Sequence, residues 1–179
     1  VAPCNADHHP MPCGHDLEVI AAAITDATRL VYLANPNNPT GTWYAADTFA
    51  GFMAKVPGDV VVVVDEAYAE FVDAPEWASA LALQTRYPNL VVARTFSKAY
   101  ALAGLRVGYA IGHPGLIAVM ERVRESFNVN SAGLAAAEAA LGDDEHLRWV
   151  VARNAEQRGI LAEAMRKRGL RVFPSQTNF

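Results

Sequence analysis

Apolar residues along the chain gather in short unbroken runs, and longer amphipathic stretches separate these runs. One run consists of five consecutive valines, flanked by Asp59 and Asp65. Unbroken runs rich in β-branched residues are typical of parallel strands that are covered on both faces. The strands predicted in this way are Leu30–Ala34, Val60–Val64 and Leu90–Ala93, with a further apolar run at Val107–Ile111.

The stretches between the strands have the length and the apolar spacing of helices, and they span residues 16–27, 45–55 and 75–87. The resulting order β-α-β-α-β predicts a layered α/β sheet. The last third of the chain predicts helices and one strand of a second, smaller unit. These are helices at 114–124, 131–141 and 145–168, the last closed by Gly169, followed by a strand at Leu170–Phe173.

Composition and charge narrow the class of protein. With 52% hydrophobic and 19% charged residues, the chain has the composition of an ordinary globular protein. The net charge of -4 argues against nucleic acid as a partner, because phosphate binding needs a basic face. We expect no membrane span, since no apolar stretch approaches the roughly 20 residues that cross a bilayer. We expect no secretory signal either, because the first residues lack a charged region and an apolar region. With only two cysteines, we expect a reducing cytoplasm.

Five possible zinc ligands fall within the first fifteen residues, namely Cys4, His8, His9, Cys13 and His15. Their spacing matches no common paired pattern of structural zinc sites. The adjacent His8 and His9 cannot easily share one tetrahedral site. We therefore predict that the chain binds no metal.

Polar residues follow each of the three predicted strands. They are Asn-Pro-Asn-Asn-Pro-Thr-Gly at 35–41, Asp-Glu-Ala-Tyr at 65–68 and Arg-Thr-Phe-Ser-Lys at 94–98, which leads into Ala-Gly-Leu-Arg at 103–106. Taken singly, each has a structural explanation as a turn, a helix cap or a solvated charge. Ligands of open α/β sheets bind outside the carboxyl ends of the strands, so the three together predict a small-molecule site.

These polar segments resemble the signature blocks of fold-type I pyridoxal-phosphate (PLP) aminotransferases, and within them the histidinol-phosphate aminotransferase group. The segment from Thr95 to Arg106 is long and specific, and the order and approximate spacing of all three blocks agree. Residues 124–130 and 177–179 also resemble that group, so the likeness covers nearly the whole chain. The resemblance implies a three-layer α/β/α fold, with a PLP-binding large-domain core over 1–125. A linking long helix and the start of a small C-terminal α+β domain would occupy 126–179.

The resemblance also implies roles around the ring of the cofactor. An aldehyde cofactor is held reversibly as a Schiff base by a lysine amine, and that lysine would be Lys98, which would also move the substrate's α-proton. Asp65 resembles the carboxylate that keeps the ring nitrogen of PLP protonated, so that the ring can accept electrons. Asn38 and Tyr68 resemble the pair that hydrogen-bonds the phenolic oxygen of the ring.

Further residues would hold the phosphate and the substrate. Thr95, Ser97 and Arg106 resemble the phosphate-binding residues of the family, since hydroxyls and a guanidinium suit an oxyanion. Asn178 resembles a substrate-binding position. The family's arginine for the substrate α-carboxylate has no counterpart in these residues. The chain starts at Val1 and stops within an apolar segment, so we expect a fragment of a longer protein. Because part of the substrate site is missing, we expect this fragment to be weakly active or inactive alone. The resemblance implies a homodimer at full length.

The predicted reaction is amino-group transfer between an amino acid or amine and a 2-oxo acid, with histidinol phosphate and 2-oxoglutarate as the favoured pair. A PLP decarboxylase of the threonine-phosphate type shares the same blocks, and carbon dioxide release would distinguish it. A non-catalytic PLP-sensing domain of the kind found in aminotransferase-like transcription regulators would follow a DNA-binding module, and none is visible in the sequence. A plain interaction domain is disfavoured, because packing alone does not require Lys98, Asp65 and Arg106 together.

Overall fold

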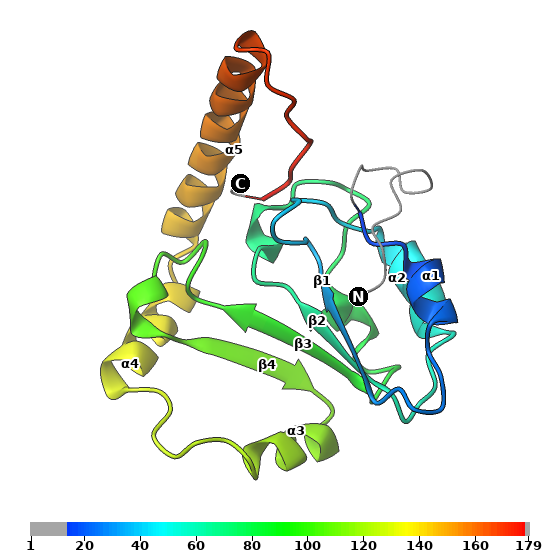
Figure 1. The fold of residues 1–179 in the computed structure, drawn as a ribbon. Helices are drawn as coiled ribbons and strands as arrows, with labels where there is room; N and C mark the ends of the chain where they lie inside the picture. The colour runs from blue at the N-terminus through cyan, green and yellow to red at the C-terminus, as the bar shows by residue number, and fades with distance from the viewer. Residues whose placement is uncertain (1–13, 178–179) are drawn as a thin grey trace.

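A four-stranded mixed sheet forms the centre of the computed structural model, which describes residues 14–177 (Figure 1). The strands are β1 (Leu30–Ala34), β2 (Val61–Asp65), β3 (Leu90–Thr95) and β4 (Gly108–Gly112), and they lie in this order across the sheet. β1, β2 and β3 are parallel to one another, whereas β4 runs antiparallel to β3. The three predicted parallel strands are confirmed, and the fourth apolar run is an antiparallel edge strand shifted by one residue.

One face of the sheet packs on two helices and forms the main hydrophobic core. Val62 and Val64 of β2 are fully buried, while Val61 and Val63 are half-buried, because successive side chains point to opposite faces. The helices that cover the buried face are α1 (Leu17–Ala22) and α2 (Ala46–Met53). Their largest buried side chains are Phe52 and Met53, each 1% exposed. Burial of one such side chain stabilises the fold by about 1.5–3 kcal/mol.

The opposite face of the sheet is covered only in part by the described residues. Leu30 and Tyr32 of β1 are 57% and 58% exposed on this face. Val91 of β3 is buried there beside Ile117 of α3 (Pro114–Glu121). The unbroken apolar runs predicted strands covered on both faces, and within residues 14–177 this holds for β3 more than for β1.

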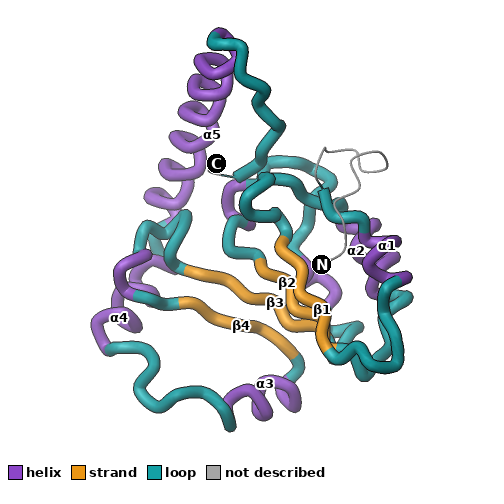
Figure 2. Tube along the Cα trace, in the orientation of Figure 1, coloured by secondary structure: helices purple, strands orange, loops and turns teal. Residues whose placement is uncertain are grey.

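Two further helices pack behind the loops at the carboxyl ends of the strands. Ala137 of α4 (Ser131–Leu141) lies in a cluster with Phe96 and Val107. α5 (Asp144–Lys167) contributes Leu147, Val150 and Val151 to a second cluster around Tyr68. α5 then extends away from the sheet, and the chain returns through residues 170–177 as a loop, drawn in teal in Figure 2.

The predicted helix at 75–87 is wrong. The structure has only a short 3-10 helix there, Ala80–Leu83, and Ser79 caps it by accepting a hydrogen bond from the Leu81 N–H. The N–H of Ala80 is bound by the carboxylate of Glu66, at 2.6 Å. A backbone donor that is held by a distant side chain is fixed in a loop conformation instead of continuing an α-helix.

Two other predicted elements differ from the structure. The first helix ends at Ala22 instead of residue 27, because the hydroxyls of Thr25 and Thr28 accept backbone hydrogen bonds and form a turn. The predicted strand Leu170–Phe173 is wrong, since this segment pairs with no strand of the described chain. Gly169 has a φ of +76°, a left-handed conformation that ends α5 as predicted.

Candidate active site

Three predicted site residues from three different loops meet at the carboxyl edge of the sheet. The side-chain amide of Asn38, after β1, donates a hydrogen bond to the hydroxyl of Tyr68, after β2, at 3.1 Å. The ammonium of Lys98, after β3, lies 5.2 Å from the centroid of the Tyr68 ring. The expectation that parallel strands bring these side chains to one edge agrees with this geometry.

Tyr68 stands between the other two residues and is held rigidly. It is 6% exposed, and its ring packs against Phe71 with the ring centroids 6.4 Å apart. Residues of α5 cover this cluster from outside. Since the ring is fixed by packing, its hydroxyl is held beside Asn38 and its face beside Lys98.

Lys98 is an exposed amine on a firmly anchored turn. Its neighbour Ala99 is fully buried and Phe96 is 4% exposed, while the Leu102 N–H donates to the Phe96 carbonyl at 2.9 Å. All three lysines of the sequence fall within residues 14–177. Lys55 pairs with Glu18 and Lys167 pairs with Glu163, and the described residues give Lys98 no such carboxylate partner.

Asp65 is the last residue of β2, and both of its carboxylate oxygens accept hydrogen bonds. Oδ1 accepts from the Ala67 N–H at 3.0 Å, and Oδ2 accepts from the Tyr32 hydroxyl at 2.5 Å. Burial, the hydrogen bond and the charge of Asp65 together raise the pKa of Tyr32 to about 12. The carboxylate is therefore oriented from two sides.

Tyr32 is a site residue that sequence reasoning missed. The strand register pairs Ala34 with Asp65, and Tyr32 lies two residues before Ala34 on the same face. An aromatic side chain can reach a diagonal neighbour on the next strand. The signal was the tyrosine within an otherwise aliphatic strand, and it becomes informative only once the pairing of β1 with β2 is known.

The predicted phosphate-binding residues lie where β3 turns back toward β4. The hydroxyl of Thr95 accepts from the Ser97 N–H at 3.1 Å and donates to the Val107 carbonyl at 3.4 Å. Ser97 is half-buried and Arg106 is exposed. The hydroxyl of Thr95 thus orders the turn that carries Ser97.

Arg106 has an uncommon backbone conformation for a residue other than glycine. Its φ of 57° and ψ of 46° are left-handed, which costs roughly 1–2 kcal/mol. Its guanidinium donates one hydrogen bond to the Ala103 carbonyl at 2.9 Å, out of five N–H donors. Backbone strain of this kind is found preferentially at functional sites.

The remaining predicted positions fall outside this geometry. Asn178 and four of the five possible zinc ligands lie outside the described residues, and only His15 lies within them. Within residues 14–177, the His, Cys, Asp and Glu side chains form no group of three or more that could hold a metal ion. Over the same residues, every helix is too short or too polar to cross a membrane.

A lysine, a carboxylate, hydroxyls and a guanidinium at the carboxyl edge of the three parallel strands are typical of a small-molecule site in an α/β protein. The family model described as aminotransferase class I and II matches residues 3–179. The chain therefore belongs to the aminotransferase class I and II family.

Over the aligned residues, relatives within the family are 50% and 56% identical to this chain. It is 56% identical over 166 residues to histidinol-phosphate aminotransferase 2 of Ralstonia nicotianae, and the match covers 93% of this chain and 44% of that protein. It is 50% identical to histidinol-phosphate aminotransferase 1 of Nitrosococcus oceani, with 97% of this chain and 48% of that protein covered. The chain thus spans about half the length of the curated relatives it matches.

A solved structure supports the same relationship. The histidinol-phosphate aminotransferase of Sinorhizobium meliloti, in complex with pyridoxal-5'-phosphate, matches with a TM-score of 0.86 at 38% identity. The match covers 91% of this chain and 44% of that one. The sheet and the loops at its carboxyl edge therefore have the fold of PLP-dependent aminotransferases.

Proposed function

We propose that the protein is a PLP-dependent aminotransferase, which moves an amino group between an amino acid or amine and a 2-oxo acid. Histidinol phosphate and 2-oxoglutarate are the proposed pair, because the relatives reported above are histidinol-phosphate aminotransferases. The single observation that carries the proposal is the meeting of Asn38, Tyr68 and Lys98 at the carboxyl edge of the sheet.

The donor chemistry of the site fits PLP, which carries an aldehyde, a ring nitrogen, a phenolic oxygen and a phosphate. The exposed amine of Lys98 suits the aldehyde, and it forms no ion pair with a carboxylate of the described residues. The Asp65 carboxylate is oriented by Tyr32 and suits a cationic ring nitrogen. When bound, PLP supplies an electron sink for the carbanion that forms at the substrate's α-carbon.

The roles of this chain's residues follow from their chemistry. Lys98 would hold the aldehyde carbon covalently, and its freed amine would carry the proton of the substrate's α-carbon. Asp65 keeps a proton on the ring nitrogen by its negative charge. Asn38 and Tyr68 donate to the phenolic oxygen, and the hydrogen bond between them holds both donors in place.

The phosphate would lie at the turn between β3 and β4. Ser97 contributes its hydroxyl, and Arg106 contributes guanidinium N–H groups beyond the one that binds Ala103. Thr95 contributes mainly by holding the Ser97 N–H. The left-handed backbone of Arg106 supports this role, since a conformation that costs stability is found preferentially at functional sites.

We further propose a cytoplasmic homodimer with a second, smaller unit that begins within residues 126–179. The direction of α5, which leaves the sheet, supports the second unit (Figure 1). Val123 and Phe127 are 83% and 99% exposed, which leaves apolar surface for the rest of the complete protein or a second copy of it to cover. The low cysteine content supports a reducing compartment. A decarboxylase has less support, because the relatives reported above are aminotransferases.

Covalent trapping tests the proposed anchor. PLP is added to the chain, the link is reduced with borohydride, and the modified lysine is mapped by mass spectrometry. We expect modification of Lys98 that is abolished when the chain is denatured first, with Lys55 and Lys167 as internal controls. Equal modification of all three lysines, or modification of none, would overturn the proposal.

A second assay tests the reaction itself. The complete gene product, loaded with PLP, is incubated with histidinol phosphate and 2-oxoglutarate, and glutamate is measured. Glutamate formation that requires Lys98 supports the aminotransferase. Release of carbon dioxide from a phosphorylated amino acid, without glutamate, would support the decarboxylase instead.

A further inference from the structure

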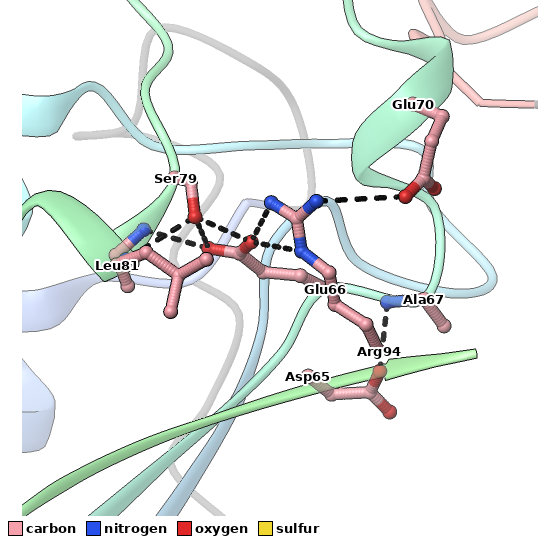
Figure 3. A network of polar contacts seen from close by, with 8 residues as sticks. Asp65, Glu66, Ala67, Glu70, Ser79, Leu81 and Arg94 are labelled. Carbon is pink, nitrogen blue, oxygen red and sulfur yellow. Dashed lines mark hydrogen bonds and ion pairs between the residues drawn. The ribbon is translucent and has the colours of Figure 1, made fainter. Parts of the chain in front are cut away.

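A fully buried carboxylate lies directly beside Asp65, and the proposed cofactor chemistry does not use it. Glu66 is 0% exposed, and its two oxygens accept hydrogen bonds from three residues in two separate parts of the chain (Figure 3). Arg94 donates from Nε at 3.1 Å and from Nη2 at 2.7 Å, both to Oε2. The Ser79 hydroxyl lies 2.7 Å from Oε2 and 3.0 Å from Oε1, and the Ala80 N–H donates to Oε1 at 2.6 Å.

A second carboxylate binds the other end of the same guanidinium. Glu70 Oε1 lies 3.6 Å from Arg94 Nη1, and its side chain is 8% exposed. Burial raises the pKa of Glu70. Burial also acts to lower the pKa of Arg94, but the hydrogen bond and the charge of Glu66, with the charge of Glu70, outweigh it and raise this pKa. Arg94 therefore stays charged and holds both carboxylates.

Strand alternation places this network behind the candidate active site. Glu66 follows Asp65 in the chain, and Arg94 precedes Thr95. Asp65 and Thr95 face the site side of the sheet, and Glu66 and Arg94 face the other side. Figure 3 shows Asp65 turned away from the network, with its own hydrogen bond to Ala67.

The network also lies where backbone pairing between the two strands stops. The last paired residues are Asp65 and Ala93, and the Glu66 N–H donates to the Ala93 carbonyl at 2.8 Å. Beyond this point β2 and β3 diverge into the loops that carry Tyr68 and Lys98. The Glu66–Arg94 pair is the side-chain contact that joins the strands at the point of divergence.

We propose that Glu66 and Arg94 are positioning residues that fix the Asp65 carboxylate relative to the turn bearing Ser97 and Lys98, and so set the affinity for PLP and the environment of its ring. This inference rests on the proposed function, because it assigns the cofactor to that site. If the pair only stabilised the core, its replacement would change the free energy of unfolding. The affinity for PLP and the environment of the bound ring would stay unchanged in the folded protein.

The first variant is Arg94→Lys, which keeps the positive charge and removes the planar fork that binds Glu66 through two N–H groups. The dissociation constant for PLP is measured by titration, and the absorption spectrum of the bound cofactor is recorded. Circular dichroism confirms that each sample is folded. We expect the dissociation constant to rise about 10- to 100-fold, by analogy with the loss of affinity found when residues that orient metal ligands are changed. We also expect a shifted absorption band.

A matched control separates positioning from stability. Val62→Ala removes core volume from the same strand on the same face, away from the Glu66 network. It is expected to lower the free energy of unfolding and to leave the dissociation constant and the spectrum of the folded protein unchanged. If Val62→Ala weakens PLP binding as strongly as Arg94→Lys does, the positioning role is refuted.

A second variant keeps the test decisive if Arg94→Lys does not fold. Glu66→Gln keeps the length of the side chain and an oxygen that can accept a hydrogen bond, and it removes the negative charge that pairs with Arg94. A weaker affinity for PLP with a displaced absorption band supports the inference, and an unchanged affinity and spectrum overturn it. If the unaltered chain binds no PLP at Lys98, the proposed function fails as well. If it binds PLP and the variants bind it equally, only the positioning role fails.

Discussion

Replacement of Gly41 by alanine tests the contact between the site loop and the segment that returns from α5. Gly41 ends the loop that carries Asn38, and its φ of +66° is left-handed. A Cβ atom added there would lie 2.0 Å from Oγ, 2.5 Å from Cβ and 2.8 Å from Cα of Ser175. The Gln176 N–H also donates to the Gly41 carbonyl, at 3.2 Å.

The magnitude follows from a comparison with Gly169, which also has a left-handed φ, +76°, but has open space around the Cβ position. The backbone cost of alanine in this conformation is about 1–2 kcal/mol. Lower entropy of the unfolded chain offsets about 0.4–1 kcal/mol of it. Gly169→Ala should therefore lose about 1 kcal/mol, and Gly41→Ala about 2–4 kcal/mol, since overpacking adds about 1–3 kcal/mol.

Urea unfolding of the unaltered chain and the two variants, followed by circular dichroism, gives these free energies when the slopes are equal. Ser175→Gly in the Gly41→Ala background should recover part of the loss, because the contacts with Oγ and Cβ disappear and the contact with Cα remains. If Gly41→Ala loses no more stability than Gly169→Ala, Ser175 does not restrict the space at the Cβ position of Gly41, and the predicted overpacking is refuted.

Three further predictions concern single side chains. In an absorbance titration, Tyr32→Phe should remove a phenol that ionises near pH 12, and Asp65→Asn should lower the pKa of that phenol; an unchanged titration curve would contradict the contact between them. Phe52→Ala should cost about 3–5 kcal/mol of unfolding free energy in urea, because the side chain is 1% exposed, and a loss below 1 kcal/mol would mean that the core closes around it. Burial raises the pKa of Glu70 above its ordinary 4.5, so the folded state binds this proton more tightly than the unfolded chain does. Its contribution to stability is therefore full below pH 4.5 and is lost as the pH rises through the raised pKa. In Glu70→Gln, the urea midpoint should fall less steeply as the pH rises through this range, because the titrating carboxyl is gone. An equally steep fall in the variant would contradict the raised pKa of Glu70.

Sequence patterns predicted the parts of the fold that local chemistry determines. The five-valine run forms β2 because β-branched residues favour strands and no glycine or proline interrupts them. The polar residues after the strands meet at one edge because β1, β2 and β3 are parallel, as the spacing of the apolar runs by long connecting segments predicted. Asn38, Tyr68 and Lys98 could be placed together on this basis.

Elements that depend on distant contacts could not be predicted locally. Residues 75–87 have helical spacing, yet the Glu66 carboxylate holds the Ala80 N–H across fourteen positions of sequence. The segment Leu170–Phe173 has the apolar composition of a strand, but a strand forms only where a neighbour accepts its backbone hydrogen bonds. Both errors came from features that lie outside any window of neighbouring residues.

Strand alternation gives the dipeptides Asp65-Glu66 and Arg94-Thr95 a common interpretation. In each dipeptide, one residue faces the candidate site and its neighbour faces the interior of the protein. The ionisable neighbour therefore has its partner on the adjacent strand. The interior partners bind each other, and the outer pair is thereby held at a fixed separation. A charged dipeptide at the end of a buried strand therefore predicts both a functional side chain and its support, once the strand pairing is known. In this chain that rule assigns Glu66 and Arg94, which motif resemblance alone left without a role.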